Sequence, residues 1–254
     1  MDKATQKKLI DITSQFYQTH ATSFSNTRNN PWEGWQRVLG IFKEVYLQDK
    51  PAGELTTFDL AAGNLRFEHF LQENLTKHQL NMYALDNCEA LLPENFTVQF
   101  QHFDILSACL HDSFSTEDIL APASDLAVSF GFMHHVPGHA MQNQILNCLI
   151  EKTKSGGLIA VTFWQFMRDE KRRNKQICKT QEAIERFELV DMGDNDYVIG
   201  WQDEADAYRY AHNFTDAEIT DLIEPYSRKI KLMNSFSADG RSHDLNKYIV
   251  LQKL

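Results

Sequence analysis

The sequence predicts an α/β fold built on a seven-stranded, mostly parallel sheet with helices on both faces. Between residues 55 and 164, short apolar runs alternate with stretches of helical periodicity, which is the rhythm of strands connected by crossover helices. Acidic residues stand at the ends of three of these strands. The chain has 254 residues, 43% of them hydrophobic, so it can bury one large core. We therefore expect a single domain over residues 1–254.

Residues 1–50 are expected to form a helical cap at the start of this domain. The segment 32–47 carries apolar residues such as Trp35 at helical spacing. Pro31 suits the start of that helix because its fixed φ fits a first helical turn. The stretch KPAGE (50–54) then breaks the pattern before the first strand.

Residues 55–164 are expected to form the ligand-binding core. Apolar and alternating patterns predict strands at 55–61, 80–86, 96–104, 124–133 and 156–164. Helical patterns occupy the segments 64–75, 88–93 and 138–153. Because helices separate most of these strands, the strands should run parallel, with their carboxyl ends along one edge of the sheet.

Residues 165–227 are expected to form a basic helical insertion, about 165–190, followed by elements on the substrate side. Thr215 with Glu218 three residues later is a capping box that starts another helix. Two C-terminal strands, at 228–237 and 245–254, should complete the sheet.

The charge of the chain is acidic overall but uneven. The formal net charge is −10, which disfavours non-specific binding to nucleic acid. The segment RDEKRRNKQICK (168–179) nevertheless holds six basic and two acidic residues, a local charge of +4. This stretch, with Arg172 and Arg173 at its centre, is either a contact for a polyanion or a solvated helix face.

Several classes of protein are disfavoured by what the sequence lacks. Its four cysteines lie far apart and form no Cys/His metal spacing, so we expect reduced thiols and no metal site. The N-terminus has no apolar signal core, and no run of about 18 apolar residues occurs. We expect a soluble cytoplasmic protein with no contact to a membrane.

The segment TTFDLAAGNLRF (56–67) has the outline of a nucleotide-binding loop. A strand ends in an acid, and small residues with one glycine, Gly63, follow before a helix. Gly63 allows a ligand to approach the backbone closely, and Asp59 is placed to tie the amides of the loop. Ala61 and Leu65 stand where further glycines would be expected, and Leu65 should crowd a pyrophosphate on the helix N-terminus.

Two further acids follow at successive strand ends. Asp86 is placed to accept hydrogen bonds from both hydroxyls of a ribose. Asp104 is placed to accept from an adenine amino group, with Phe103 or Ile105 against the ring. One such acid often only caps a turn, but three in this order favour a nucleoside ligand. S-adenosylmethionine has no phosphate and carries a sulfonium cation, so it suits a loop poor in glycine and a pocket rich in acids.

These features resemble class I S-adenosylmethionine-dependent methyltransferases, whose first motif here stands as DLAAGNLR with only its middle glycine. The resemblance implies a Rossmann-like fold and S-adenosyl-L-methionine as the cofactor. The residues expected to hold that cofactor are Asp59, Ala61, Gly63, Asp86, Asn87, Asp104, Ile105 and Phe130.

A narrower resemblance depends on five segments in order: FSNTRNNPWEGW (24–35), DLAAGNLRF (59–67), HHV (134–136), SGGLIAVTFW (155–164) and YRYAHNFTDAEITDLI (208–223). Together they are similar to the tRNA wobble-uridine methyltransferases that esterify a carboxymethyl group. This resemblance implies tRNA as the substrate and a small zinc-binding protein as an activating partner.

Candidate catalytic and acceptor-binding residues come from these segments. Guanidinium groups match a carboxylate or a phosphate, so Arg28 and Arg209 are expected to hold an anionic acceptor. His134 is either a catalytic base or a structural histidine, and only one of the adjacent pair His134 and His135 should face the pocket. Contacts to the acceptor are expected from Trp32, Tyr208, Tyr210, His212, Arg172 and Arg173 as well.

Three functions remain open on the sequence. The first is a tRNA methyltransferase, for which Arg168, Lys171, Arg172 and Arg173 should gather with Arg28 and Arg209. The second is a small-molecule methyltransferase with a closed pocket and no basic rim. The third is a binding protein that kept the fold and lost its cofactor, for which the missing glycines are the best argument.

Overall fold

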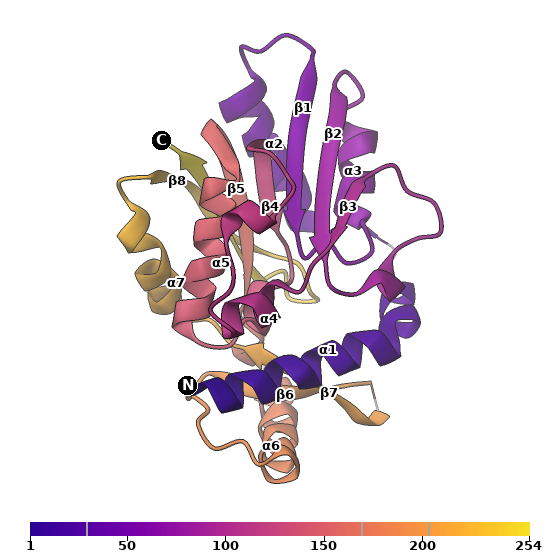
Figure 1. Cartoon of the computed structure of the whole chain (residues 1–254), viewed down its shortest axis with the longest axis vertical. Coiled ribbons are helices and arrows are strands. Elements are labelled where there is room, and N and C mark those ends of the chain that lie inside the picture. The colour runs from indigo at the N-terminus through magenta and orange to yellow at the C-terminus, as the bar shows by residue number, and fades with distance from the viewer. Residues whose placement is uncertain (29, 169, 203) are drawn as a thin grey trace.

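A seven-stranded sheet organises the protein (Figure 1). The structure, a computed structural model, describes all residues except 29, 169 and 203, and all side chains except theirs and those of residues 170–172 and 205. The strands of the sheet are β1 (Glu54–Leu60), β2 (Gln79–Asp86), β3 (Gln99–His102), β4 (Ser124–Ser129), β5 (Thr153–Trp164), β8 (Ile230–Ala238) and β9 (Asn246–Lys253).

The order of the strands is β3-β2-β1-β4-β5-β9-β8. The first five strands along the chain pair in parallel, whereas β9 pairs antiparallel with both β5 and β8. This arrangement confirms the predicted seven-stranded, mostly parallel sheet. The order reverses between β1 and β4, and in open parallel sheets that reversal marks the crevice where ligands bind.

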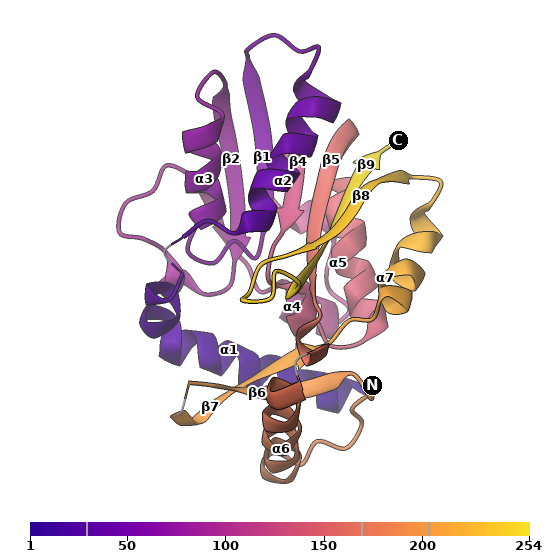
Figure 2. The same ribbon diagram turned by 180° about the vertical axis from the view of Figure 1, so that it is seen from behind.

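Helices cover both faces of the sheet, as predicted. The helices are α1 (Lys3–Asn26), α2 (Glu33–Phe42), α3 (Arg66–Asn74), α4 (Ile105–Leu110), α5 (His139–Glu151), α6 (Glu170–Phe187) and α7 (Asp216–Ile223). A π-helical turn, Lys43–Leu47, extends α2. Helices α4, α5 and α7 cover one face (Figure 1), and α2 and α3 cover the other (Figure 2).

Alternation along the strands builds a separate apolar core under each layer. On β4, Ala127 packs with the α4–α5 layer, whereas Leu126 and Val128 pack with the α2–α3 layer. This follows from the two-residue period of a strand, which points successive side chains to opposite faces. Helix α2 buries Trp35 and Phe42 at the helical spacing predicted for this segment.

Helix α1 crosses the edge of the sheet at which the parallel strands end (Figure 1). Asp2 caps this helix by accepting from the backbone N–H of Thr5 over 2.7 Å. Of the segment predicted as a cap, α1 covers this edge, while α2 packs on a face of the sheet as part of the core. The helix α1 therefore forms a wall over the strand ends.

A hairpin and a helix stand beyond α1. The hairpin consists of β6 (Asp196–Trp201) and β7 (Glu204–His212), which pair antiparallel, and α6 packs on β6 on the side away from the main sheet (Figure 1). The basic helix was predicted here but the two strands were not, because tyrosines, an arginine and small residues give no clear apolar alternation. Helix α7 begins at the predicted capping box, in which Thr215 and Glu218 bond reciprocally.

Other boundaries differ from the predictions for identifiable reasons. The fourth strand ends at Ser129 and not at 133, because Gly131 takes a positive φ of 72° and a 3-10 turn, Met133–His135, follows. The third strand is shorter than predicted, and the unpredicted helix α4 begins directly after it at Asp104, which caps it.

Candidate active site

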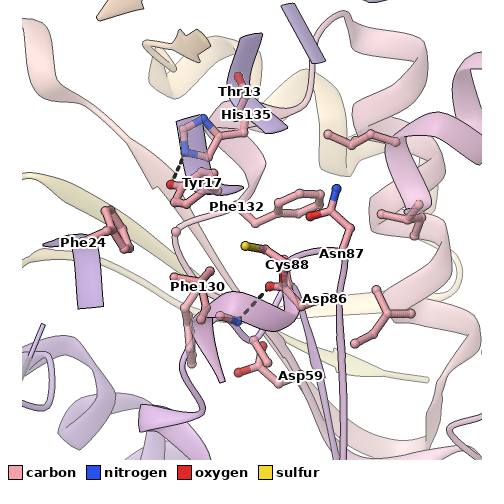
Figure 3. Close-up of a pocket in the computed structure, with 18 of the residues that line it drawn as sticks. Thr13, Tyr17, Phe24, Asp59, Asp86, Asn87, Cys88, Phe130, Phe132 and His135 are labelled. Carbon is pink, nitrogen blue, oxygen red and sulfur yellow. Dashed lines mark hydrogen bonds between the residues drawn. The ribbon is translucent and has the colours of Figure 1, made fainter. Parts of the chain in front are cut away.

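A cavity opens at the carboxyl ends of β1, β2 and β4, between the sheet and helix α1 (Figure 3). Its empty volume is about 1180 Å³, including the open mouth. Because this volume includes open solvent, the site is defined by its lining residues and not by its size. The predicted site residues that line the cavity are Arg28, Trp32, Asp59, Ala61, Gly63, Asp86, Asn87, Asp104, Ile105, Phe130, His134 and Arg209.

The first loop keeps a tight turn although two of its glycines are missing. Ala61, Gly63 and Leu65 all take a left-handed φ, at 64°, 59° and 57°. A Cβ atom on Gly63 would meet nothing within 4 Å, so a ligand has free access to this stretch of backbone. Each non-glycine residue in this conformation costs about 1–2 kcal/mol, which the surrounding structure must offset.

Leu65 does not crowd the cavity. Its side chain is buried in an apolar cluster with Met82, Ala84 and Val98, on the far side of the loop. The expectation that Leu65 would obstruct a ligand at this helix N-terminus is therefore wrong, because the positive φ turns its side chain toward β2. Its burial also explains why a leucine is kept at a strained position.

Asp86 holds the first loop in place. Its Oδ2 accepts from the backbone N–H of Gly63, and its Oδ1 accepts from that of Cys88, both over 2.8 Å. We expected Asp59 to tie this loop, but the bonds come from the acid of the neighbouring strand. Burial raises the pKa of Asp86, while these backbone donors act against that rise. The same residue lines the cavity.

Two other acids lie at the same end of the cavity. Asp104 accepts from the backbone N–H of Ser107 over 2.9 Å and so combines helix capping with a place on the cavity wall. Asp59 is buried, and burial, followed by the charge of Glu68, raises its pKa well above the ordinary value. Glu68 was not predicted as a site residue, since a glutamate in a first helical turn usually serves the helix alone.

The opposite end of the cavity is cationic. Arg209 is 5% exposed, and neither its Nε nor its Nη1 has a hydrogen-bond partner. Its guanidinium lies 4.8 Å from the ring centroid of Phe16 and 5.0 Å from that of Trp201. Burial is the main cause that lowers the pKa of Arg209, to about 10, so the group stays charged at neutral pH.

Two more arginines line this end. Arg28 lies over the ring of Phe24 at 4.3 Å, and burial lowers its pKa. Arg66 donates to the carbonyl oxygen of Asn30 over 2.8 Å, and burial followed by the charge of Arg28 lowers its pKa to about 10. Among the described residues, none of these three guanidinium groups has a carboxylate partner. Arg66 was missed because it directly follows the loop motif and resembles an ordinary helix residue.

Both histidines of the predicted pair line the cavity. We expected only one to face it, but they lie on a 3-10 turn and not on a strand, so alternation does not apply. His134 stacks on Trp164, with ring centroids 3.8 Å apart. His135 Nδ1 lies 2.5 Å from the carbonyl oxygen of Tyr210 and therefore donates to it, which leaves Nε2 to accept from the hydroxyl of Tyr17 over 2.9 Å (Figure 3).

Both histidines are neutral and weakly basic at neutral pH, because their pKa values are lowered. Burial is the first cause that lowers the pKa of His134 far below the ordinary value, followed by the charges of His135 and Arg209. Burial, with Arg209 second, lowers the pKa of His135 to about 3. Burial also raises the pKa of Tyr17. Proton abstraction by these residues is therefore disfavoured, and the cavity favours an acceptor that is already ionised.

Three predicted acceptor residues lie outside the cavity, because β7 alternates. Arg209 points into the cavity, so its neighbours Tyr208 and Tyr210 point to the other face of the hairpin. The Tyr210 hydroxyl donates to Asp196 Oδ1 over 2.6 Å, and His212 Nδ1 lies 2.7 Å from the same oxygen. These side chains fasten the hairpin internally.

The basic helix does not reach the cavity through its described side chains. Arg173 donates to the carbonyl oxygen of Met167, and Arg168 lies 3.6 Å from Asp244. Neither lines the cavity, so the expected gathering with Arg28 and Arg209 is not seen for them. The side chains of Lys171 and Arg172 lie outside the described residues.

The described residues contain no group of three or more His, Cys, Asp or Glu side chains able to hold a metal ion. Within the same part of the chain, the helices are all too short or too polar to span a bilayer.

Comparison with known proteins gives structural matches alone, since no family model and no curated protein matches the sequence. A SAM-dependent methyltransferase from Methanosarcina mazei has a TM-score of 0.57 at 14% identity, covering 82% of this chain and 96% of its own. The DhpI–SAM–HEP complex gives 0.56 at 14% identity, over 96% and 97% of the two chains.

The 1,6-didemethyltoxoflavin-N1-methyltransferase of Burkholderia thailandensis, with bound 1,6-didemethyltoxoflavin and S-adenosylhomocysteine, gives 0.53 at 11% identity, over 94% and 88% of the chains. At such low identities the likeness is one of fold. The chain has the fold of the S-adenosylmethionine-dependent methyltransferases.

Proposed function

We propose that this protein transfers the methyl group of S-adenosylmethionine to an ionised carboxylate and so forms a methyl ester. The observation that carries the proposal is Arg209, a buried guanidinium with two free donors in the same cavity as the strand-end acids. A buried guanidinium whose Nε and Nη1 have no hydrogen-bond partner is costly, so its presence there fits a role in holding an anion.

The acidic end suits the cofactor. Asp86 is placed to accept from ribose hydroxyls, and Asp104 with Ile105 to hold the adenine. The free approach to the Gly63 backbone and the unpartnered Oδ1 of Asp59 fit the amino acid part of the molecule. S-adenosylmethionine supplies a methyl group on a cationic sulfonium, which these acids would favour electrostatically.

The cationic end suits the acceptor. A carboxylate is ionised at neutral pH, so an oxygen–carbon bond can form as the sulfur–carbon bond breaks, with no proton to remove. This agrees with the lowered pKa values of His134 and His135. Arg209 and Arg28 would then align the carboxylate, and alignment of this kind can supply up to about 7–11 kcal/mol.

We further propose tRNA as the carrier of that carboxylate, in the form of a carboxymethyl group on the wobble uridine. The support is the sequence resemblance to the tRNA wobble-uridine methyltransferases, together with the position in the structure of two of the segments that carry this resemblance. Its two segments outside the core, FSNTRNNPWEGW (24–35) and YRYAHNFTDAEITDLI (208–223), each contribute one arginine to the cavity, Arg28 and Arg209.

A small carboxylic acid is the second candidate acceptor. Helix α1 runs over the strand ends, and α6 contributes no described side chain to the cavity wall. Both features fit an acceptor that enters the cavity whole. They support this alternative independently of the resemblance.

The test joins binding to transfer. Calorimetric titration with S-adenosylmethionine and S-adenosylhomocysteine measures cofactor binding, and labelled methyl transfer is then assayed with carboxymethyluridine-containing tRNA and with a panel of small carboxylic acids. A methyl ester is identified by release of labelled methanol in mild alkali. Labelled methyl on tRNA alone would support tRNA as the acceptor. Labelled methyl on a small acid alone would support a small carboxylic acid as the acceptor. No cofactor binding by the folded protein would favour a binding protein that has given up this chemistry.

A further inference from the structure

A buried pair of acids lies behind the first loop. Asp59, near the end of β1, lines the cavity (Figure 3) and is 5% exposed. Glu68, in the first turn of α3, is 2% exposed. Their carboxyl groups interact side by side. Asp59 Oδ1 and Glu68 Oε2 have no hydrogen-bond partner.

The surroundings of the pair do not neutralise it. The groups that act electrostatically on Asp59 are Glu68 and Asp86, and both are acidic. The aromatic side chains of Trp35, Phe67 and Phe130 line the same cavity as Asp59. Two adjacent carboxylates in an apolar setting cannot both ionise cheaply, so such pairs share a proton. Burial accordingly raises the pKa of both members.

We propose that Asp59 and Glu68 share one proton in the free protein and release it when the cationic cofactor binds beside Asp59. This inference rests on the proposed use of S-adenosylmethionine. The O–H bond of the shared carboxylic acid breaks, the proton passes to the buffer, and the positive charge of the bound ligand takes its place. Glu68 does not line the cavity and acts on the ligand through Asp59, as a positioning residue.

Glu68 also lines a second groove, between α3 and the segment 93–98, together with His69 and Asn95. One member of the pair thus borders the cavity and the other borders a surface groove.

The linkage has a defined sign. If binding releases a proton, affinity rises with pH, by up to about tenfold per pH unit, until the pair loses its proton without ligand. Above that pH the affinity becomes constant. In a variant without this acid pair, the affinity for S-adenosylmethionine should not show this rise with pH.

The experiment counts protons. S-adenosylmethionine is titrated into the full-length protein in two buffers with different ionisation enthalpies, at about pH 6 and about pH 9. The dependence of the observed heat on the buffer gives the protons released per ligand bound. We expect release approaching one proton at the lower pH and none at the higher. The variant Glu68→Gln, whose amide mimics the protonated acid, should bind with no release at either pH.

The control is Glu73→Gln on the same helix, where the side chain is exposed and lies 3.2 Å from His69. It should release protons as the wild type does. Binding without release in the wild type, or equal release in Glu68→Gln, would overturn the proposal while leaving the proposed function intact. A lack of any binding heat would instead count against the proposed function.

A second measurement needs no ligand. Infrared difference spectra of the free protein between the two pH values should contain the C=O band of a protonated carboxylic acid, and Glu68→Gln should lose it. Absence of that band from the wild type would overturn the shared proton directly.

Discussion

The backbone N–H of Gly63 donates to Asp86 Oδ2 over 2.8 Å, so the loop after β1 is held by the acid that ends β2. The parallel pairing of these two strands brings them together, with Leu60 opposite Leu85 in the register. One carboxylate therefore shapes the loop and also faces the cavity. This double role makes Asp86 the first residue to replace in a test of the proposed cofactor site.

Replacing Asp86 by Ala should weaken S-adenosylmethionine binding by at least about tenfold. Hydrogen bonds to charged groups contribute about 1.5–3 kcal/mol each, and the substitution removes those to the ligand as well as the tie to Gly63. Asp86→Asn keeps an acceptor oxygen, so its dissociation constant for S-adenosylmethionine should lie between those of the wild type and Asp86→Ala. Calorimetric titration measures the dissociation constants, with Asp49→Ala, an exposed acid, as the control. An unchanged constant for Asp86→Ala would remove this residue from the cofactor site.

Arg209→Met should abolish methyl transfer while leaving cofactor binding nearly unchanged. The same substitution should raise the thermal stability of the free protein, because it removes a buried charge whose Nε and Nη1 have no hydrogen-bond partner and fills the space with an apolar chain. Transfer assays and thermal melts of the same sample test both parts. Arg186→Met, at an exposed ion pair, is the matched control and should leave both properties nearly unchanged. A lower melting temperature for Arg209→Met would indicate a structural role.

The sequence allowed the sheet, and the gathering of the strand-end acids at one edge of it, to be predicted well, whereas the use of these acids in cofactor binding stays a prediction. Strand alternation and strand-end acids are local patterns, and the parallel sheet then brings Asp59, Asp86 and Asp104 to one edge. The acceptor end was predicted less well. Arg209 was chosen from a resemblance, and its neighbours Tyr208 and Tyr210 were placed with it because the strand β7 was not recognised.

Residues that act through long-range packing could not be found in this way. Glu68 looks like any acid in a first helical turn, and its importance comes from a partner nine residues earlier in the chain. His135 was dismissed by an alternation rule that fails on a 3-10 turn. In each case the missing information was the local backbone conformation, which the residue types alone do not determine.

Ala61→Gly and Leu65→Gly should have opposite effects on stability. Both positions take a left-handed φ, so glycine relieves about 1–2 kcal/mol of strain at each, less its own entropic cost of up to about 1 kcal/mol. Ala61 loses only a methyl group, and we expect a neutral or slightly higher free energy of unfolding. Leu65 also loses a buried side chain, which costs about 2–5 kcal/mol, so a clear loss is expected. Urea denaturation measures both, and equal changes at the two sites would contradict the assigned orientation of Leu65.

The two histidines should make the stability of the protein depend on pH near 6.5, but not its rate of methyl transfer. His134 and His135 have lowered pKa values in the folded protein and ordinary values, near 6.5, when unfolded. The unfolded state therefore binds more protons below about pH 6.5, and stability should fall as the pH drops through that region, by up to about 1.4 kcal/mol per pH unit for each histidine. By contrast, kcat/KM with a carboxylate acceptor should show no histidine-dependent change near that pH. Both imidazole rings stay neutral there, and the reaction abstracts no proton. Melting temperatures and kcat/KM are measured over the same pH series, with His135→Gln as the comparison. A limb near pH 6.5 that disappears in His135→Gln would mean that this histidine takes a proton, and the acceptor would then be a neutral group and not a carboxylate.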